Sequence, residues 1–269
     1  MTAVNPIERA LHPAAAPETA SPPRRLLPVL GVPIDAINLA EAVQRIAAWA
    51  EHRDSRVVCI CNAHSVVTAG QDPGFMQVLR SADMTTPDGA PVAWMLRRQG
   101  AAGQGRVSGP DLMPDYFQHA AAAGEPVFLY GSTPETLHRL KAVLRRRWPA
   151  LKIAGAVSPP FRALTESEDQ LIVDQINASG ARTVWVSLGC PKQERWMAAH
   201  HGRVQAVMVG VGAAFDFHAG TVARAPEWMQ RHGLEWLHRL ASEPGRLGRR
   251  YITTNSAFLL GALRQLLRL

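Results

Sequence analysis

The chain has 269 residues, of which 47% are hydrophobic and 19% charged, a composition that excludes wholly disordered and fibrous proteins. Its net charge of +7 is uneven, because from Arg239 onward six arginines face a single acidic residue, Glu243, which predicts that this end meets an anionic surface or ligand. No apolar run reaches about 18 residues, which argues against a membrane-spanning helix, and three cysteines without a framework spacing fit a reducing compartment.

The first part of the chain differs in composition from the rest. Residues 1–28 are rich in Ala and Pro and lack the apolar stretch of a signal peptide. We therefore expect a disordered or loosely attached arm there.

After Ile34 the sequence alternates between helical periodicity, first seen over 40–49, and short β-branched runs. The expected strands cover residues 57–61, 126–130, 151–157, 183–188 and 204–211. Such alternation predicts an α/β core over 29–232, built as a Rossmann-like, mostly parallel sheet flanked by helices. From Gly233 the pattern changes, and we expect a basic helical appendage over 233–269.

Ligands of parallel sheets bind beyond the carboxyl ends of the strands, so the residues that follow each strand are the first candidates for a site. Asn62 follows the first predicted strand, and Gly131 follows the next. Both are therefore candidate substrate-binding residues.

Asp88 lies in a Thr-Pro-Asp-Gly turn, where the stiff backbone can hold its carboxylate in one orientation. A fixed and partly desolvated aspartate can act as a general base if its pKa is raised. The alternative is a turn residue that accepts hydrogen bonds from its own backbone.

Arg106 follows a Gly-rich loop and could clamp phosphate or substrate oxygens, or simply be solvated. The Gly-Cys-Pro-Lys-Gln-Glu segment at 189–194 follows a strand and opens a helix, so Lys192 and the backbone could face an anion. Gln193 could bind a polar substrate. An ordinary strand-to-helix turn is the alternative.

The segment from Gly210 to Asp216 resembles a dinucleotide-binding fingerprint, but Phe215 occupies the position of the third glycine. Gly210 and Gly212 would still let a ligand approach the backbone, and Asp216 could bind a ribose hydroxyl or a base edge. Close packing of strand and helix explains the two glycines equally well. The segment is the ground for one alternative function, a nicotinamide-dependent oxidoreductase.

No metal site and no cofactor are predicted. Cys59 and Cys61 share one face of a strand, where small buried hydrophobic residues are common, and the sequence has no C-x-x-C pair. It also lacks the D-x-D carboxylates that hold a divalent cation in many nucleotide-sugar enzymes. The charge of a pyrophosphate would then have to be met by arginines or lysines.

The last predicted helix, 257–269, is amphipathic and carries Arg264 and Arg268 four residues apart. A basic amphipathic helix is typical of a membrane-surface element, although its apolar stripe could also pack on the core of the protein. Nucleic acid is not expected as a partner, because basic residues are not interleaved with aromatic ones along the body of the chain.

Nine motifs in fixed order resemble those of the WecG/TagA/CpsF glycosyltransferases over about residues 30–250. They are GVPID (31–35), CNAHS (61–65), TPDG (86–89), RVSGPDLM (106–113), FLYGS (128–132), LGCPKQERW (188–196), GVGAAFDFHAG (210–220), RAPEW (224–228) and GLEWLHRLASEPGR (233–246).

This resemblance implies an inverting, metal-independent hexosyltransferase that uses no cofactor. It would move N-acetylmannosamine, its uronic acid or glucose from a UDP-sugar to a sugar linked to polyprenyl diphosphate. The product would serve the synthesis of surface polysaccharide or teichoic acid linkage units. The resemblance also implies a peripheral location on the cytoplasmic face of the plasma membrane, reached through the C-terminal appendage, and we expect self-association.

Carried over by motif, the resemblance makes Asp88 the general base and places Asn62, Arg106 and Gln193 in the sugar pocket. It assigns three appendage arginines to the diphosphate: Arg239, Arg246 and Arg249. One position departs from the family pattern, since Ile60 stands where a threonine often helps catalysis. That departure is the ground for a second alternative, a non-catalytic membrane adaptor with a degenerate sugar site.

Overall fold

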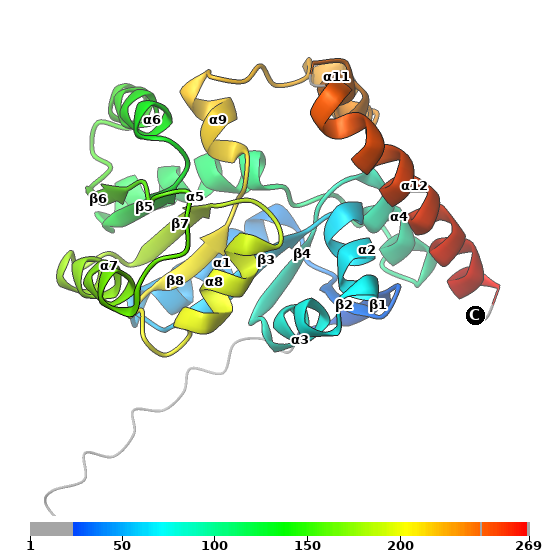
Figure 1. The fold of residues 1–269 in the computed structure, drawn as a ribbon, viewed down its shortest axis with the longest axis horizontal. Coiled ribbons are helices and arrows are strands. Elements are labelled where there is room, and N and C mark those ends of the chain that lie inside the picture. The colour runs from blue at the N-terminus through cyan, green and yellow to red at the C-terminus, as the bar shows by residue number, and fades with distance from the viewer. Residues whose placement is uncertain (1–23, 243, 268–269) are drawn as a thin grey trace, which may run out of the picture.

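The computed structural model, which describes residues 24–242 and 244–267, is built on a six-stranded parallel sheet (Figure 1). The strand order is β4-β3-β8-β7-β5-β6. The strands are β3 (Arg56–Cys61), β4 (Met84–Pro87), β5 (Val127–Gly131), β6 (Ile153–Val157), β7 (Thr183–Ser187) and β8 (Val207–Gly210). The predicted Rossmann-like parallel sheet is confirmed, and its five predicted strands all form. The edge strand β4 was not predicted, because it has four residues and ends in a proline.

Helices cover both faces of the sheet (Figure 1). One face carries α1 (Leu39–Glu51), α5 (Gly109–Ala123), α6 (Pro134–Arg147) and α9 (Ala214–Ala219). The other carries α2 (Ala63–Gln71), α3 (Pro73–Ser81), α4 (Ala90–Arg98), α7 (Glu166–Ala178) and α8 (Lys192–His200). Strand residues alternate between the two cores, so that Val58 and Leu129 point to the first while Cys59 and Phe128 point to the second. Cys59 and Cys61 are both buried in this second core, as the strand pattern predicted.

A two-stranded antiparallel hairpin of β1 (Leu26–Val29) and β2 (Val32–Asp35) precedes the sheet. The buried Asp35 carboxylate joins it to β4, because it accepts hydrogen bonds from the Arg24 side chain at 2.7 and 2.9 Å and from the Thr85 amide at 2.7 Å. Residues 24–28, which composition assigned to the N-terminal arm, therefore belong to the fold. The arm's residues 1–23 lie outside the described residues.

The C-terminal segment forms α10 (Glu227–Arg231), α11 (Glu235–Ser242) and α12 (Pro244–Leu266). Helix α12 runs beside α2 (Figure 1), with Phe258 and Ala262 buried in the core of that face. Near its end the Gln265 side chain accepts a hydrogen bond from the Leu30 amide at 2.8 Å and donates one to the Pro28 carbonyl at 2.7 Å. The appendage therefore packs directly on the core and the hairpin.

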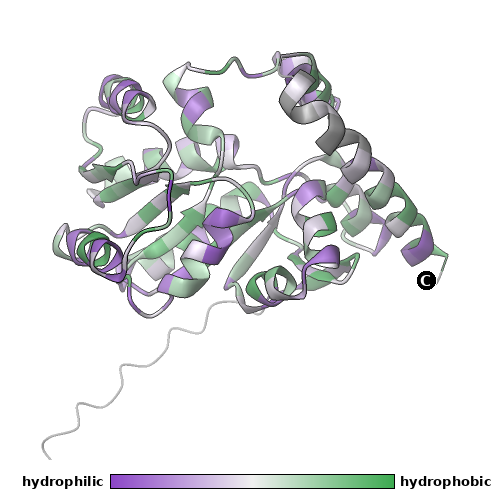
Figure 2. Cartoon of the chain, viewed as in Figure 1, coloured by the Kyte–Doolittle hydropathy of each residue, from purple (hydrophilic) through white to green (hydrophobic). Residues whose placement is uncertain are grey.

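Helix α12 also leaves a row of large apolar side chains exposed. This row, the leucine stripe, consists of Leu259, Leu260 and Leu263 on the helix and Leu267 directly after its end. Figure 2 shows the hydrophobic residues along the C-terminal half of α12. One side of the helix therefore packs on the core, as one interpretation of its amphipathic pattern predicted, and another side faces solvent. Contact with a membrane stays a prediction. No helix within the described ranges is long and apolar enough to cross a membrane.

Gly131 illustrates how closely the central strands pack. Its φ is +111°, and a Cβ at this position would lie 2.3 Å from the carbonyl oxygen of Ser187 on the neighbouring strand β7. Glycine is therefore required both by the backbone conformation and by the space.

We predict that Gly131→Ala lowers the free energy of unfolding by about 3 kcal/mol, because the added methyl group meets fixed backbone at a strained φ. Urea unfolding followed by circular dichroism measures this. The matched control is Gly70→Ala in α2, where the new Cβ meets nothing within 4 Å, so stability should stay level or rise by up to about 1 kcal/mol. Normal stability of Gly131→Ala would show that packing does not require this glycine.

Candidate active site

A cavity of about 780 Å³ lies at the carboxyl ends of the strands. Residues that end or follow β3, β4, β5, β7 and β8 line it, as expected for a parallel sheet. Eight of the predicted site residues line this cavity: Asn62, Asp88, Arg106, Gln193, Gly210, Gly212, Asp216 and Arg239. Gly131 is not among the lining residues. The side chains of Arg246 and Arg249, on α12, lie outside the described part of the structure.

Asp88 follows β4 directly and lies on the cavity wall. Its backbone amide donates to the Cys61 carbonyl at 3.0 Å, which fixes the turn against the end of β3. Burial raises the pKa of its carboxyl group to about 6, and the negative charges of Glu235 and Asp111 act in the same direction. Arg106 and a hydrogen bond from Asn62 act in the opposite direction. Asp88 is therefore ionised at neutral pH yet basic enough to accept a proton.

Asn62 fixes the position of the Asp88 carboxylate from the neighbouring strand end. It is the N-cap of α2, and its side-chain oxygen accepts a hydrogen bond from the Ser65 amide at 3.1 Å. Because the oxygen is engaged in this cap, the side-chain NH2 group of Asn62 is the part that faces Asp88, and it donates a hydrogen bond to the Asp88 carboxylate. Asn62 thus both begins the helix and orients the carboxylate.

Arg106 belongs to a ring of four alternating charges at the edge of the cavity. Its Nη1 atom lies 3.0 Å from Oε2 of Glu235, and its Nη2 atom lies 3.6 Å from Oδ2 of Asp111. Arg224 closes the ring, with Nε 3.2 Å from Oε1 of Glu235 and Nη2 2.6 Å from Oδ1 of Asp111. We call this set the charge ring. Arg106 is therefore held by protein carboxylates and is not a solvated loop arginine.

Sequence reasoning gave no role to the other three members of the charge ring. The residues stood inside quoted motifs, Asp111 in RVSGPDLM, Arg224 in RAPEW and Glu235 in GLEW. Their pairing joins segments more than 100 residues apart, which no local pattern reveals. The sequence hinted at this ion-pair network only through the charged residues of opposite sign in these three motifs.

Gln193 is buried and largely occupied by contacts within the protein. Its side-chain oxygen accepts from the Gly212 amide at 3.1 Å, and its Nε2 donates to Oε1 of Glu194 at 2.9 Å. A Cβ on Gly210 would lie 3.0 Å from that nitrogen and 2.7 Å from Cε of Met197. Gly210 therefore makes room for side chains of α8, in keeping with the packing interpretation.

Asp216 and Arg239 lie on other walls of the cavity. One Asp216 carboxylate oxygen, Oδ1, has the hydroxyls of Ser132, Thr136 and Thr221 at 3.4 Å each, so it ties α9 to the turn after β5. The guanidinium of Arg239 lies over the Phe217 ring, 5.3 Å from its centre. Two arginines, Arg106 and Arg239, are among the described residues that line the cavity.

Ile60, the one position that departs from the pattern of the resembled family, lies on the cavity wall. Its partner on β4 is Thr86, and Thr85 is the partner of the preceding residue, Cys59, but both threonine hydroxyls are engaged elsewhere. Thr86 donates to the Val107 carbonyl at 3.0 Å, and Thr85 donates to the Pro33 carbonyl at 2.6 Å. Neither hydroxyl replaces the one that Ile60 lacks.

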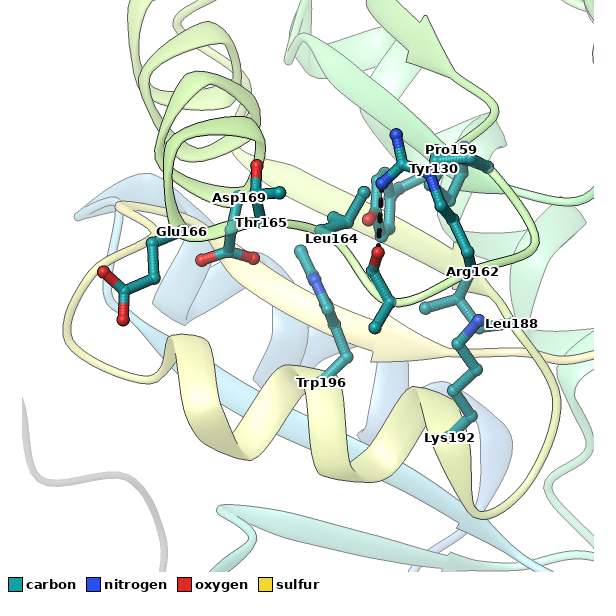
Figure 3. A pocket seen from close by; sticks show the side chains of 12 residues that line it. Tyr130, Pro159, Arg162, Leu164, Thr165, Glu166, Asp169, Leu188, Lys192 and Trp196 are labelled. Carbon is teal, nitrogen blue, oxygen red and sulfur yellow. Dashed lines mark hydrogen bonds between the residues drawn. The ribbon is translucent and has the colours of Figure 1, made fainter.

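A second hollow of about 320 Å³ (Figure 3) shares Leu188 with the larger cavity. Tyr130 and Trp196 stack in it with their ring centres 4.4 Å apart. Lys192, a candidate for facing an anion, lines this hollow and not the larger cavity. Arg162, also at this hollow, is paired with Glu168 at 2.6 and 2.7 Å.

Within the described ranges no group of three or more His, Cys, Asp or Glu side chains could hold a metal ion. Metal independence stays a prediction.

Comparison with protein families gives one match that covers nearly the whole chain. The model of the glycosyl transferase WecG/TagA/CpsF family matches residues 27–269. The resemblance that the motifs indicated is thereby confirmed. The match begins in the hairpin and includes the C-terminal helices, so it covers every wall of the larger cavity.

Glu194 is a buried acid beside Gln193, and its burial makes the stability of the protein depend on pH. The residue is 1% exposed, and its Oε2 atom has no hydrogen-bond partner among the described residues. Burial raises its pKa from 4.5. The folded protein therefore holds this proton more tightly than the unfolded chain, and the contribution of Glu194 to stability falls as pH rises from about 4.5 to its folded pKa.

We predict that Glu194→Gln gains thermal stability relative to the wild type on going from pH 4.5 to pH 8.5, because glutamine cannot ionise. Melting temperatures of both proteins across this range measure the difference. The exposed Glu166→Gln in α7 serves as control. A difference between Glu194→Gln and wild type that is independent of pH would contradict the prediction.

Proposed function

Since the chain belongs to the WecG/TagA/CpsF family of glycosyltransferases, we propose that it transfers a sugar from a UDP-sugar to a polyprenyl-diphosphate-linked sugar with inversion at the anomeric carbon. The observation that carries the proposal is Asp88. It combines a pKa of about 6 with a place on the wall of a cavity large enough for a sugar nucleotide. N-acetylmannosamine, its uronic acid and glucose are the candidate donor sugars.

The proposed reaction is a single displacement. Asp88 takes the proton from the acceptor hydroxyl, while the hydroxyl oxygen bonds to the anomeric carbon and the bond from that carbon to UDP breaks. Attack from the side opposite UDP inverts the anomeric centre. Asn62 holds the carboxylate in place during the transfer.

The departing UDP needs positive charge near its diphosphate. Arg239 lines the cavity, and we assign it to the diphosphate. The sequence motif adds Arg246 and Arg249 to this role. Because the sequence has no D-x-D carboxylates, we include independence from a divalent cation in the proposal.

We further propose that the protein works as a peripheral protein on the inner face of the plasma membrane, where its lipid-linked acceptor resides. The leucine stripe supports this, since its four large apolar side chains face solvent on, or directly after, a helix that continues from a basic segment. Insertion of such a face among lipid headgroups buries apolar area, and arginines add attraction to anionic lipids.

The two alternative functions are less well supported. For the oxidoreductase, the space above Gly210 is filled by Gln193 and Met197, which leaves little room for a dinucleotide at that glycine. The adaptor rests on Ile60 alone, whereas Asp88 keeps the pKa and the hydrogen-bond partner of a working base.

The test is release of UDP by the purified protein in the presence of EDTA, with a panel of UDP-sugars and a short-chain prenyl-diphosphate-linked sugar. We expect acceptor-dependent release from one donor, with an acidic limb near pH 6 because protonated Asp88 cannot accept a proton. Asp88→Asn should lower kcat by about 10²- to 10⁴-fold while UDP-sugar binding, measured by calorimetry, stays nearly unchanged. Wild-type kcat in Asp88→Asn would overturn the assignment of the base, and UDP binding without release from any pair would favour the adaptor.

For the membrane, we predict that Leu260→Glu and Leu263→Glu reduce co-sedimentation with vesicles that contain anionic phospholipid, because each places a charge on the face that should enter the headgroup region. Leu171→Glu is the matched control, since Leu171 is at least as exposed as these leucines but lies on α7. Equal loss of binding in all three variants would point to added negative charge and not to the leucine stripe.

A further inference from the structure

We propose that Glu235 is a positioning residue through which the docked C-terminal helices complete the catalytic site, because it holds Arg106 away from Asp88. The inference rests on the proposed function, in which Asp88 is the base. It assigns to the appendage a role inside the site itself, in addition to meeting the membrane and the diphosphate.

The geometry of the charge ring carries the inference. Glu235 stands in the first turn of α11, where both of its carboxylate oxygens face arginines. Arg106 directs Nη1 to Glu235 at 3.0 Å, and its Nη2 lies 3.5 Å from the side-chain oxygen of Gln230 on α10. Within the described residues no ion pair joins Arg106 to Asp88, although both line the same cavity.

The electrostatics explain why this matters for a base. Arg106 lowers the pKa of Asp88, whereas Glu235 is the charge that raises it most. An aspartate paired directly with an arginine is a weak base, since the guanidinium stabilises its ionised form. Glu235 prevents that pairing by occupying the guanidinium, and it adds a negative charge of its own near the carboxylate.

Other titratable groups also surround Asp88. Besides Arg106 and Glu235, they are Asp111 and its partner Arg224 in the charge ring, Cys61 at the end of β3, His64 on α2, and Arg239 on α11. Among them Glu235 and Arg239 come from the C-terminal helices. Undocking of α11 would remove Glu235 and Arg239 together, so the net charge of the site would stay nearly level. Arg106 would keep only the longer contact to Asp111, at 3.6 Å, and its Nη1 would be free to turn toward Asp88.

This arrangement couples two events that the proposed reaction needs to occur together. The C-terminal helices carry the leucine stripe, and the same segment carries the carboxylate that keeps Asp88 basic. A molecule whose helices are displaced from the core has a weakened base. Transfer is then favoured only when the segment that meets the membrane is seated.

The test is Glu235→Gln, assayed by UDP release from pH 4.5 to 8.5. We expect kcat to fall about tenfold and the acidic limb of the kcat profile to move to lower pH by at least about one pH unit, because Arg106 then stabilises ionised Asp88. Glu227→Gln, an exposed acid on the neighbouring α10, should leave both unchanged. Glu235→Asp, which keeps the charge, should restore part of the wild-type limb. A fall in kcat with the limb unmoved would overturn the proposal and leave Glu235 a purely structural residue.

A second measurement separates this inference from the proposed function. The carboxyl carbon of Asp88, followed by ¹³C NMR in the full-length, substrate-free protein, should titrate at lower pH in Glu235→Gln than in the wild type. An unchanged Asp88 titration overturns the inference even if the wild type is fully active. A shifted titration in a protein that releases no UDP from any donor would uphold the coupling and overturn the transferase proposal.

Discussion

The charge ring is the interaction on which the site depends most, because it is where the C-terminal helices meet the sheet-bound part of the cavity. Its members come from the loop before α5, from the first turn of α5, from the segment before α10 and from α11. Each carboxylate lies between two arginines and each arginine between two carboxylates, so that half-buried charges are neutralised without help from solvent. Loss of any one member leaves its neighbours with an unbalanced charge. The cavity therefore has a shape that is specified electrostatically as well as by packing.

Periodicity was sufficient to predict the sheet, because β5, β7 and β8 are buried on both sides and read as apolar runs that end in glycine or serine. It failed for β4 and for the hairpin. β4 contains two threonines, whose hydroxyls are satisfied by distant carbonyls that the sequence does not display. β1 adjoins an Ala- and Pro-rich stretch and was assigned to it by composition, whereas the Arg24–Asp35 ion pair joins it to the fold.

The candidate site divides in the same way. Asn62 was predictable, since it directly follows a predicted strand. Asp88 was singled out by its Thr-Pro-Asp-Gly turn, although the strand before it, β4, was not predicted. The glycines were ambiguous, because a glycine after a strand can admit a ligand or a neighbouring residue. Gly131 faces the Ser187 backbone and Gly210 faces Gln193, so both are explained by packing. Glu235 was beyond reach of local reasoning, since its partner Arg106 is 129 residues away.

The pinning of α12 on the hairpin has a consequence for how the protein is made. The side chain of Gln265 bonds to Leu30 and Pro28, and a Cβ on Gly261 would lie 2.4 Å from the Leu30 side chain, so the contact is close and joins positions 235 residues apart. Contacts of such long range form late, after local structure. During synthesis the hairpin is made long before α12, so the two can pack together only after α12 has left the ribosome. The cavity wall that α11 and α12 provide is thus the last to assemble, after the strands of the sheet have paired.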